Sequence, residues 1–480
     1  MVIKKDEEPD LPPVPPIPTR VLSNGEYVPL PKTQKQREVD HRLLEYADRY
    51  GKPRGLSRRR FLKTASGFAA AMLAMNRVYG RNYFSVAEVE AADEAAAVEA
   101  ALKKRKGSQF VLDDQTHWLN AAALENAKTE RGKIVRDFLM GFRNSVKPNS
   151  KIQDIGTELA YVQQVFLESE TTMSIISGVP AAANDPEILL PIESMVATRD
   201  HVNAKAGTRR MLSHGLVAPN DPRNLDMMEW QAKDLKIDSW KGYTADGISG
   251  RYPSGGYYGG WFLDDLKVAF PMYDKARKLG IKTFCIHKGL AVIWFDEKYC
   301  RLHDLEPAAL ANPDLNFIIY HSGYPWVDDL VNITRWKRNP ALNVANNVYA
   351  ELGSTFALTV TGAPMEAAHV MGKLITHVGA DRIMWGSDST WWGSPQWQID
   401  AFRRFQIPED IQKGYGYKPI TDKDKEMILG LNAARVYGID VAKTMTQLAQ
   451  DEISTLRAAV APQFTPEYRK YAAAAGVPTG

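Results

Sequence analysis

Short apolar runs alternate with longer amphipathic stretches along most of the chain from residue 110 onward. The runs are rich in β-branched and aromatic side chains, as buried strands are, whereas the stretches between them repeat their apolar positions with the period of a helix. The predicted strands cover residues 110–113, 173–177, 210–217, 235–240, 282–286, 316–320, 348–351 and 382–385. Helices are predicted at residues 186–204, 225–233, 263–279, 365–378, 394–405 and 422–437.

This alternation predicts an α/β fold. Strands that alternate with helices form parallel βαβ units, and eight such units are the number found in a (β/α)8 barrel. We therefore expect a TIM barrel over residues 107–445, with long loops at its active-site end and residues 422–437 as the closing helix. A doubly wound open sheet is the alternative.

Two segments precede the predicted barrel and one follows it. Residues 1–56 are predicted to be a polar, Pro-rich N-terminal extension outside the core, in which the run at residues 11–18 predicts polyproline II or disorder. Residues 57–92 contain S-R-R-R-F-L-K followed by an uncharged stretch, which matches a twin-arginine signal and predicts export to the periplasm. That stretch is too short for a stable membrane span, and a basic start to an amphipathic helix is the alternative. A helical tail is expected at residues 446–480.

Composition narrows the classes of function. The chain is 44% hydrophobic and 24% charged, with a formal net charge of +3, which is typical of a soluble globular protein. The small positive excess is spread along the chain and gives no nucleic-acid signature. With two cysteines, neither a disulfide framework nor a thiolate metal cluster is expected. Any metal ion must therefore be held by nitrogen and oxygen ligands.

Polar residues follow several of the predicted strands, where the active site of such a barrel lies. They are Gln115 and His117 after the first strand, His287 after the fifth, His321 after the sixth, Glu351 at the end of the seventh and Asp388 after the eighth. Gln115 and His117 share one face of an extended strand because they are two residues apart. A pair of histidines at this spacing would be a metal clamp, and here a carboxamide replaces the first imidazole.

At these positions the chain resembles the amidohydrolase superfamily, in the branch related to aminocarboxymuconate-semialdehyde decarboxylase. D-D-Q-T-H at residues 113–117 stands where the family has D-x-H-x-H. The other motifs are F-C-I-H-K-G at 284–289, Y-H-S-G at 320–323, W-G-S-D at 385–388 and L-G-L-N-A-A-R at 429–435. The resemblance covers about residues 107–440, and because this branch often forms dimers it also implies a homodimer.

The resemblance implies one divalent metal ion, with zinc expected and manganese or iron as alternatives. His117 and His287 would be ligands, and Asp388 would be a ligand or the base that takes a proton from metal-bound water. His321 would be the general acid or would orient that water. A metal ion with an open position lowers the pKa of bound water from about 15.7 toward 7, which makes proton transfer feasible at neutral pH.

Gln115 departs from the family pattern and leaves three alternatives. In the first alternative, His117, His287 and Asp388 hold the ion and Gln115 is a weak fourth ligand, because an amide oxygen suits harder ions better than zinc. In the second, Lys241 is carboxylated and bridges two ions, as in other branches of the superfamily. In the third, the site has lost its metal and only the barrel remains.

Other residues are candidates for contact with a small-molecule substrate. Lys241 and Lys288 stand at predicted strand ends and could neutralise a substrate carboxylate, and Glu351 and Trp391 could line the pocket. Residues 242–262, rich in glycine and aromatic side chains, predict a lid or an ordered loop. The expected function is hydrolysis of a small amide, lactone or ester. The alternatives are non-oxidative decarboxylation of an aromatic or unsaturated acid, and a non-catalytic barrel.

Overall fold

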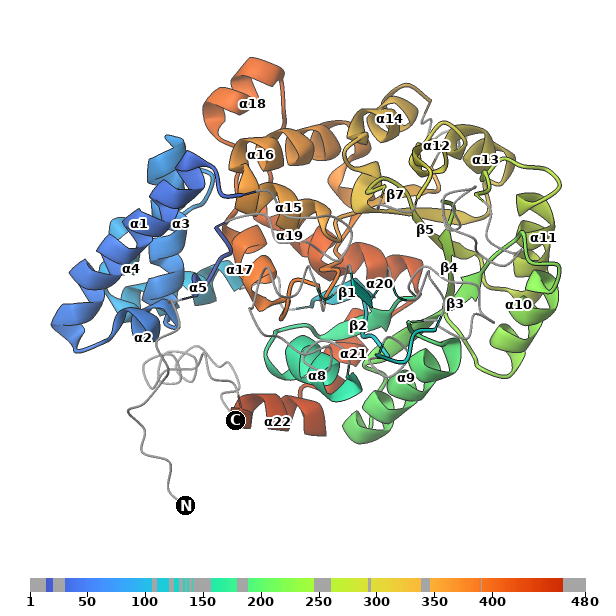
Figure 1. Cartoon of the computed structure of the whole chain (residues 1–480), viewed down its shortest axis with the longest axis horizontal. Coiled ribbons are helices and arrows are strands. Elements are labelled where there is room, and N and C mark those ends of the chain that lie inside the picture. Colours follow the sequence, from blue (N-terminus) through green and yellow to red (C-terminus); the bar gives the residue numbers. More distant parts are fainter. Residues whose placement is uncertain are drawn as a thin grey trace.

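The computed structural model describes residues 14–460 apart from 20–30, 106–109, 121–124, 129–132, 134–135, 138–139, 141–156, 179–188, 246–259, 292–294, 338–345 and 390. Most of the predicted lid therefore lies outside the described residues. Figure 1 shows a sheet surrounded by helices, with a separate group of N-terminal helices on one side.

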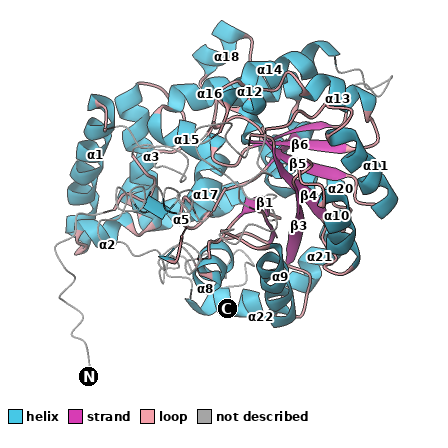
Figure 2. Cartoon of the chain, turned by 45° about the vertical axis from the view of Figure 1, so that its right-hand side comes forward, coloured by secondary structure: helices cyan, strands magenta, loops and turns pink. Residues whose placement is uncertain are grey.

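Eight parallel strands follow one another around the sheet in sequence order. They are β1 (Leu112–Thr116), β2 (Met173–Ile176), β3 (Met211–Val217), β4 (Ser239–Tyr243), β5 (Thr283–His287), β6 (Asn316–Tyr320), β7 (Val348–Glu351) and β8 (Ile383–Met384). Each strand pairs with the next, and the expectation of a TIM barrel is confirmed. Figure 2 shows the strands inside the ring of helices.

Backbone hydrogen bonds between β1 and the residues after β8 close the barrel. The Asp114 N–H donates to the Trp385 carbonyl at 3.1 Å, and the Asp388 N–H donates to the Gln115 carbonyl at 2.9 Å. A parallel bridge joins Thr116 to Ser389 farther along. These bonds place Gln115 and Asp388 side by side although 272 residues separate them in the sequence, as their numbers show.

Strand alternation separates the apolar side chains into two layers. One layer fills the barrel and includes Leu112, Ile175, Leu212, Ile318 and Met384. The other layer packs outward against the helices, which bury their apolar faces on it. Interior positions near the C-terminal ends of the strands carry polar side chains instead.

The barrel helices agree broadly with the predicted ones. In chain order they are α8 (Glu158–Val162), α9 (Ile192–Ala206), α10 (Asn224–Lys233), α11 (Ala269–Leu279), α12 (Glu297–Cys300), α13 (Leu305–Ala311), α14 (Val327–Asn332), α15 (Thr355–Gly362), α16 (Pro364–Lys373), α17 (Gln396–Arg404), α18 (Glu409–Tyr415), α19 (Asp422–Glu426), α20 (Asn432–Val436), α21 (Val441–Leu448) and α22 (Glu452–Val460). The closing helix is α19 and α20 joined by a π-helical turn at Met427–Leu431. Helix α15 was not predicted, because its side chains are buried on nearly every face and give no amphipathic pattern.

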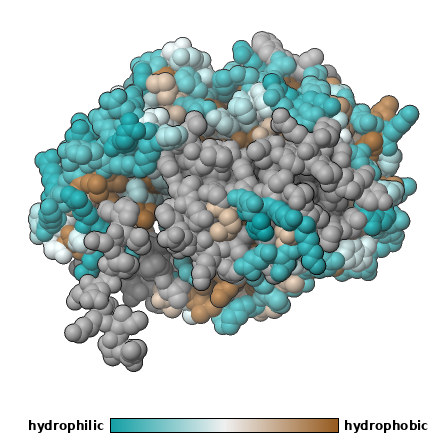
Figure 3. Space-filling view, viewed as in Figure 1, coloured by the Kyte–Doolittle hydropathy of each residue, from teal (hydrophilic) through white to brown (hydrophobic). Residues whose placement is uncertain are grey.

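Much of the described N-terminal region is helical, whereas residues 14–19 of the Pro-rich run form neither helix nor strand. The region comprises α1 (Gln34–Tyr46), α2 (Arg58–Leu62), α3 (Ala65–Tyr79), α4 (Glu88–Ala92) and α5 (Glu94–Arg105). The uncharged stretch of the signal-like segment forms α3, a largely buried helix that packs against α1, α4 and α5. The outer face of this helical region is largely hydrophilic (Figure 3), as expected for helices that bury one side.

Specific contacts hold these helices on the barrel. Phe84 forms an antiparallel bridge with Phe405, and the buried Arg404 guanidinium donates to the Glu90 carboxylate at 2.6 Å. Near α1, the Gln36 amide donates to the Gly362 carbonyl at 3.2 Å. Among the described helices, none has the length and apolar character needed to cross a membrane.

A buried ion pair attaches the C-terminal tail to the barrel. The Arg210 guanidinium, before β3, donates to the Asp451 carboxylate at 2.7 Å and to the Leu448 carbonyl at 3.2 Å. Both side chains are almost completely buried. Asp451→Ala leaves this guanidinium buried without its counter-charge, and we expect the free energy of unfolding in urea to fall by about 3 kcal/mol.

Glu409→Ala is the matched control, because it removes an exposed carboxylate that pairs with Lys413. We expect its effect to stay within about 0.5 kcal/mol. Equal effects of Asp451→Ala and Glu409→Ala would show that the buried pair does not stabilise the fold.

Candidate active site

Strained backbone marks the C-terminal ends of the last four strands. Leu290 follows β5 with φ 33°, His321 follows β6 with φ 63°, Ser354 follows β7 with φ 55° and Asp388 follows β8 with φ 57°. Side chains other than glycine rarely adopt positive φ, and such residues cluster at functional sites. The same end of the barrel carries the histidines and the aspartate that the sequence singled out.

His117 and Asp388 form the first pair of candidate ligands. His117 Nδ1 lies 2.7 Å from the Ser177 carbonyl oxygen, which can only accept a hydrogen bond. In the neutral ring, Nδ1 therefore carries the proton and Nε2 presents a lone pair. This Nε2 lies 3.0 Å from Asp388 Oδ1, which is also an acceptor. Two acceptors at this distance require a proton or a metal ion between them.

His287 and His321 repeat this arrangement. His321 Nδ1 donates to the Gly353 carbonyl at 2.7 Å, and His287 Nε2 donates to the Leu290 carbonyl at 3.2 Å. His321 Nε2 lies 3.1 Å from His287 Nδ1, and the proton of one ring or a metal ion must lie between these two nitrogens. Backbone carbonyls thus lie beside all three imidazoles and direct the opposite ring nitrogen of each into the site, as is usual for histidines that bind metal ions.

Gln115 lies beside the first pair. Its Nε2 donates to Asp388 Oδ1 at 3.0 Å and lies 3.4 Å from His117 Nε2. Its Oε1 is buried and has no hydrogen-bond partner among the described residues. Rotation of the carboxamide by half a turn exchanges the two atoms and would present the oxygen to the same place. Gln115 can therefore add an oxygen donor to the pair formed by His117 and Asp388.

The donor set fits a divalent ion if the carboxamide is included. Within the described ranges, no three His, Cys, Asp or Glu side chains gather into a group that could hold a metal ion. The expected ligands are divided instead: His117 and Asp388 form one pair, and His287 pairs with His321. Imidazole, carboxylate and amide donors suit zinc, manganese or iron.

Burial controls the protonation of these side chains. It lowers the pKa of His321 to about 4 and takes the pKa of His287 well below its usual value, so both rings are neutral at pH 7. Burial opposes ionisation of Asp388, but the His117 imidazole and the Ser354 hydroxyl outweigh it and lower the pKa. A neutral imidazole and an ionised carboxylate are the forms that bind metal ions or accept protons. As a neutral ring, His321 suits proton acceptance or water orientation better than the general-acid role.

Lys241 places an unpaired ammonium group inside the barrel. The side chain is 1% exposed, and its Nζ has no hydrogen-bond partner in the part of the chain that the structure describes. The Nζ lies 3.5 Å from the centre of the Tyr320 ring and 4.9 Å from that of Tyr243, which stacks on His287. Burial lowers the pKa of Lys241 to about 8. The ammonium form therefore predominates at neutral pH and offers its donors to an anionic ligand.

The acidic residues around Lys241 are also buried. Burial raises the pKa of Asp113 to about 7 and takes those of Asp114 and Glu351 well above their usual range. Glu351 accepts hydrogen bonds from the backbone N–H groups of His321, at 3.1 Å, and Gly353, at 2.5 Å. Both of its oxygens are therefore used to position the residues after β6 and β7. Glu351 therefore supports the backbone around the site. Direct contact between Glu351 and a substrate stays a prediction.

Lys288 and Trp391 have different surroundings from Lys241. The Lys288 ammonium donates to both oxygens of Asp304, at 2.7 and 2.8 Å, and to two backbone carbonyls. These contacts use all its donors to hold the loop after β5. Trp391 is partly buried and packs with the apolar cluster that includes Leu290 and Tyr324.

Sequence reasoning missed one residue of the site. Ser354 donates a hydrogen bond to Asp388 Oδ2 and accepts one from Trp392 Nε1 at 2.9 Å. It thereby fixes which carboxylate oxygen faces His117. The available signal was the pair Gly353 and Ser354, which begins two residues after the end of the seventh predicted strand.

Comparison with known proteins gives a match to one family model over part of the chain. Residues 206–439 match the model of a family described as amidohydrolase. This range contains His287, His321 and Asp388 and leaves out Gln115 and His117. No curated protein matches the chain.

Several solved structures are similar at low identity. The 2,6-dihydroxybenzoate decarboxylase from Rhizobium is 16% identical, with 68% of this chain and 98% of that chain covered and a TM-score of 0.40. A dihydroxybenzoic acid decarboxylase from Polaromonas, with bound manganese and 2-nitroresorcinol, is 15% identical, with 70% and 99% covered and a TM-score of 0.42. A 4-oxalomesaconate hydratase from Rhodopseudomonas palustris is 15% identical, with 70% and 98% covered and a TM-score of 0.41. Similarity at this level says nothing about the reaction of this chain.

Gln115→His tests whether this position faces a metal ion. We expect the Kd for Mn²⁺ or Zn²⁺, measured by equilibrium dialysis with elemental analysis, to fall by about tenfold or more, because imidazole is the stronger donor. Gln406→His, at a partly exposed glutamine that contacts the Asn82 carbonyl, is the control and should leave the Kd unchanged. An unchanged Kd for Gln115→His would place its side chain outside the metal centre.

Proposed function

We propose that this protein is a metal-dependent enzyme of the amidohydrolase type that removes CO2 non-oxidatively from an aromatic or unsaturated carboxylic acid. The observation that carries the metal centre is the fixed orientation of His117, His287 and His321, whose opposite ring nitrogens are directed into the site. The match of residues 206–439 to the amidohydrolase family supports the same class.

His117, Asp388 and the Gln115 carboxamide would hold the ion, with His287 and His321 as further donors. A bound divalent ion supplies positive charge that polarises a substrate oxygen and acidifies water. Zinc is the expected metal from the imidazole donors, and the oxygen donors of Asp388 and Gln115 suit manganese equally well.

Lys241 favours decarboxylation over hydrolysis. Its buried ammonium has no hydrogen-bond partner among the described residues, although the nearby carboxyl groups of Glu351, Asp388 and Asp114 favour the charged form. A substrate carboxylate would accept a charge-assisted hydrogen bond from it. In the reaction the bond between carbon and the carboxylate breaks, and its electron pair stays on the substrate carbon, which then takes up a proton. The proton comes from water: the Asp388 carboxylate, ionised at neutral pH, is placed to take a proton from water and pass it to the substrate carbon, which leaves hydroxide, and the neutral His321 ring is placed to orient that water. The preference rests on these residues and not on the low-identity structures.

Hydrolysis of an amide, lactone or ester is the second candidate. The observation that favours it is the ionised Asp388 carboxylate beside His117, which suits a base that takes a proton from water. Hydrolysis has no use for the unpaired ammonium of Lys241 unless the substrate also carries an anionic group.

A substrate panel separates the two reactions. Aromatic and unsaturated acids, esters, lactones and amides are incubated with the Mn²⁺-loaded and Zn²⁺-loaded protein, and released CO2 and new carboxylate are measured. Decarboxylation predicts CO2 release from an acid, and loss of that release in Asp388→Asn. New carboxylate without CO2 would support hydrolysis. Activity with neither group, together with less than about a tenth of an equivalent of purified metal, would favour a non-catalytic barrel.

Lys241→Met tests the carboxylate contact directly. We expect kcat/KM for the acid to fall about a hundredfold at pH 7, because a charge-assisted hydrogen bond is lost at nearly constant volume. In the unaltered protein, kcat/KM should fall about tenfold per pH unit above pH 8, since the ammonium form disappears there. The variant should lack this alkaline limb.

Lys282→Met is the matched control, because this lysine is half-exposed and pairs with Asp314 on the surface. It should keep both the rate and the pH profile. A Lys241→Met protein with an unchanged alkaline limb would exclude Lys241 from substrate recognition.

We also propose export to the periplasm and a homodimer. Export rests on S-R-R-R-F-L-K at residues 57–63, and cell fractionation with the intact mass of the recovered chain tests it. Because α3 is largely buried, we expect the signal-like segment to remain in the folded protein after export. An intact mass that lacks this segment would show that it is removed.

A further inference from the structure

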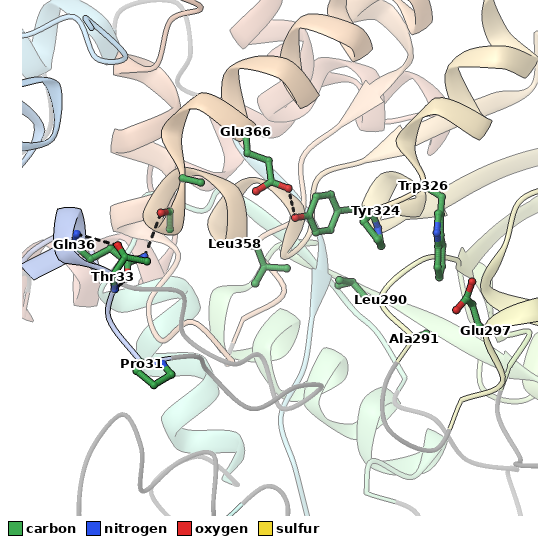
Figure 4. A pocket seen from close by; sticks show the side chains of 13 residues that line it. Pro31, Thr33, Gln36, Leu290, Ala291, Glu297, Tyr324, Trp326, Leu358 and Glu366 are labelled. Atoms are coloured by element: carbon green, nitrogen blue, oxygen red, sulfur yellow. Dashed lines mark hydrogen bonds between the residues drawn. The ribbon is translucent and has the colours of Figure 1, made fainter. Parts of the chain in front are cut away.

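A cavity of about 540 Å³ opens near the C-terminal end of the barrel. It lies between the N-terminal segment that leads into α1 and the loops that follow β5 and β6 (Figure 4). Its volume is within the range of small-molecule pockets. Residues 31–36, which form this wall, lie outside the range that matches the amidohydrolase family model.

The N-terminal wall is held in a defined conformation. Thr33 caps α1, and its N–H donates to the Gln36 side-chain oxygen at 2.9 Å while the Gln36 N–H donates back to the Thr33 hydroxyl at 3.2 Å. The Gln36 amide also donates to the Gly362 carbonyl at the end of α15. Pro31 adds a rigid apolar surface to this wall. The wall is therefore attached to the barrel and not merely adjacent to it.

The opposite wall is connected to both pairs of candidate ligands. Leu290 lines the cavity, and its carbonyl oxygen accepts the hydrogen bond that orients His287. Leu358 also lines it and belongs to the same apolar cluster as Trp392. Trp392 donates to Ser354, which in turn donates to Asp388. A ligand in the cavity would thus contact Leu290, which orients His287, and Leu358, which packs with the Trp392 that holds Ser354 against Asp388.

The lining selects against anions. Pro31, Leu290, Trp326 and Leu358 supply apolar surface, and the charged residues among the described lining are the carboxylates of two glutamates. No lysine, arginine or histidine is found among those described lining residues. Glu297 is ion-paired with Arg301, whose guanidinium stacks on the Trp326 ring, and the Glu366 carboxylate accepts a hydrogen bond from the Tyr324 phenol. An anionic ligand would lie near the Glu366 carboxylate, whereas an uncharged ring would bury its surface on apolar side chains.

The phenol of Tyr324 adds one polar point of contact. It donates to the Glu366 carboxylate, and burial together with this contact raises its pKa well above the usual value for a phenol. The group therefore remains a neutral phenol across the physiological range. Figure 4 shows this pair at the top of the cavity, with Leu290 and Leu358 below it.

We propose that this cavity is a binding site for an uncharged, ring-bearing small molecule and that residues 31–36 form its specificity wall. The proposal that a ligand binds here rests on the volume and the apolar lining of the cavity. Identification of the ligand with the apolar part of the substrate rests on the proposed function, in which the substrate carboxylate is held separately by Lys241.

The test uses the full-length protein and two matched probes of similar size, neutral 2-naphthol and anionic 2-naphthalenesulfonate. Fluorescence or calorimetric titration should give saturable binding of one equivalent of 2-naphthol, and binding of the sulfonate at least about tenfold weaker. Equal affinity for the two probes would overturn the charge selection, and the absence of saturable 2-naphthol binding would overturn the site.

Two variants locate the binding. Ala291→Trp adds a ring at an exposed lining position, and Leu358→Trp fills the cavity from α15. Each should weaken 2-naphthol binding about tenfold or more, since bulk replaces the free volume. Leu310→Trp, at an exposed leucine of α13 outside the lining, is the control and should leave it unchanged. Wild-type affinity in folded Ala291→Trp protein would overturn the proposal.

Lys241→Met separates this inference from the proposed function. Its 2-naphthol affinity should equal that of the unaltered chain, because Lys241 does not line the cavity. Intact probe binding without decarboxylation of any acid would refute the proposed reaction and leave the site standing. If Ala291→Trp and Leu358→Trp abolish 2-naphthol binding but leave the rate of decarboxylation unchanged, the ligand of this cavity is not the apolar part of the substrate.

Discussion

Fixed imidazole tautomers are the constraint on which the site depends. Backbone carbonyls of Ser177, Leu290 and Gly353 each accept a hydrogen bond from one histidine, and each bond directs the other ring nitrogen inward. A protein interior does not tolerate facing lone pairs without a cation or a proton between them. The fold therefore creates a demand for a proton or a cation at each of two pairs, His117 with Asp388 and His287 with His321, and the reactivity we propose is the use of positive charge there.

The same constraint explains the strained backbone at the strand ends. A carbonyl can accept from a ring nitrogen only if the loop that carries it turns back toward the barrel axis. Leu290 and Ser354 adopt positive φ next to the carbonyls that orient His287 and His321, and Asp388 does so beside His117. Such conformations cost about 1–3 kcal/mol each and persist where surrounding contacts hold them. Closure of the barrel between β1 and β8 provides such contacts, since the Asp388 N–H bonds to β1.

Particular residues show how far sequence alone could go. The eight strands were predictable because alternation of apolar runs with helical periods is a local property, and the histidines followed from their positions directly after those runs. Ser354 and the structural use of Lys288 were not predictable, because each depends on a partner from a distant strand or loop. Helix α1 carries its apolar residues at Val39, Leu43 and Tyr46, a weak helical period that the Pro-rich surroundings concealed.

The sequence by itself determined the order of the strands and which polar side chains stand at their ends, because strand alternation and strand order are set by neighbouring residues. The tertiary structure alone decided that Gln115 meets Asp388, that Lys241 is buried with no hydrogen-bond partner in the described part of the chain, and that residues 31–36 form a wall beside the barrel. These relations arise when the sheet curls closed and distant segments share one volume. Burial and charge then assign each group a protonation state that no local pattern contains.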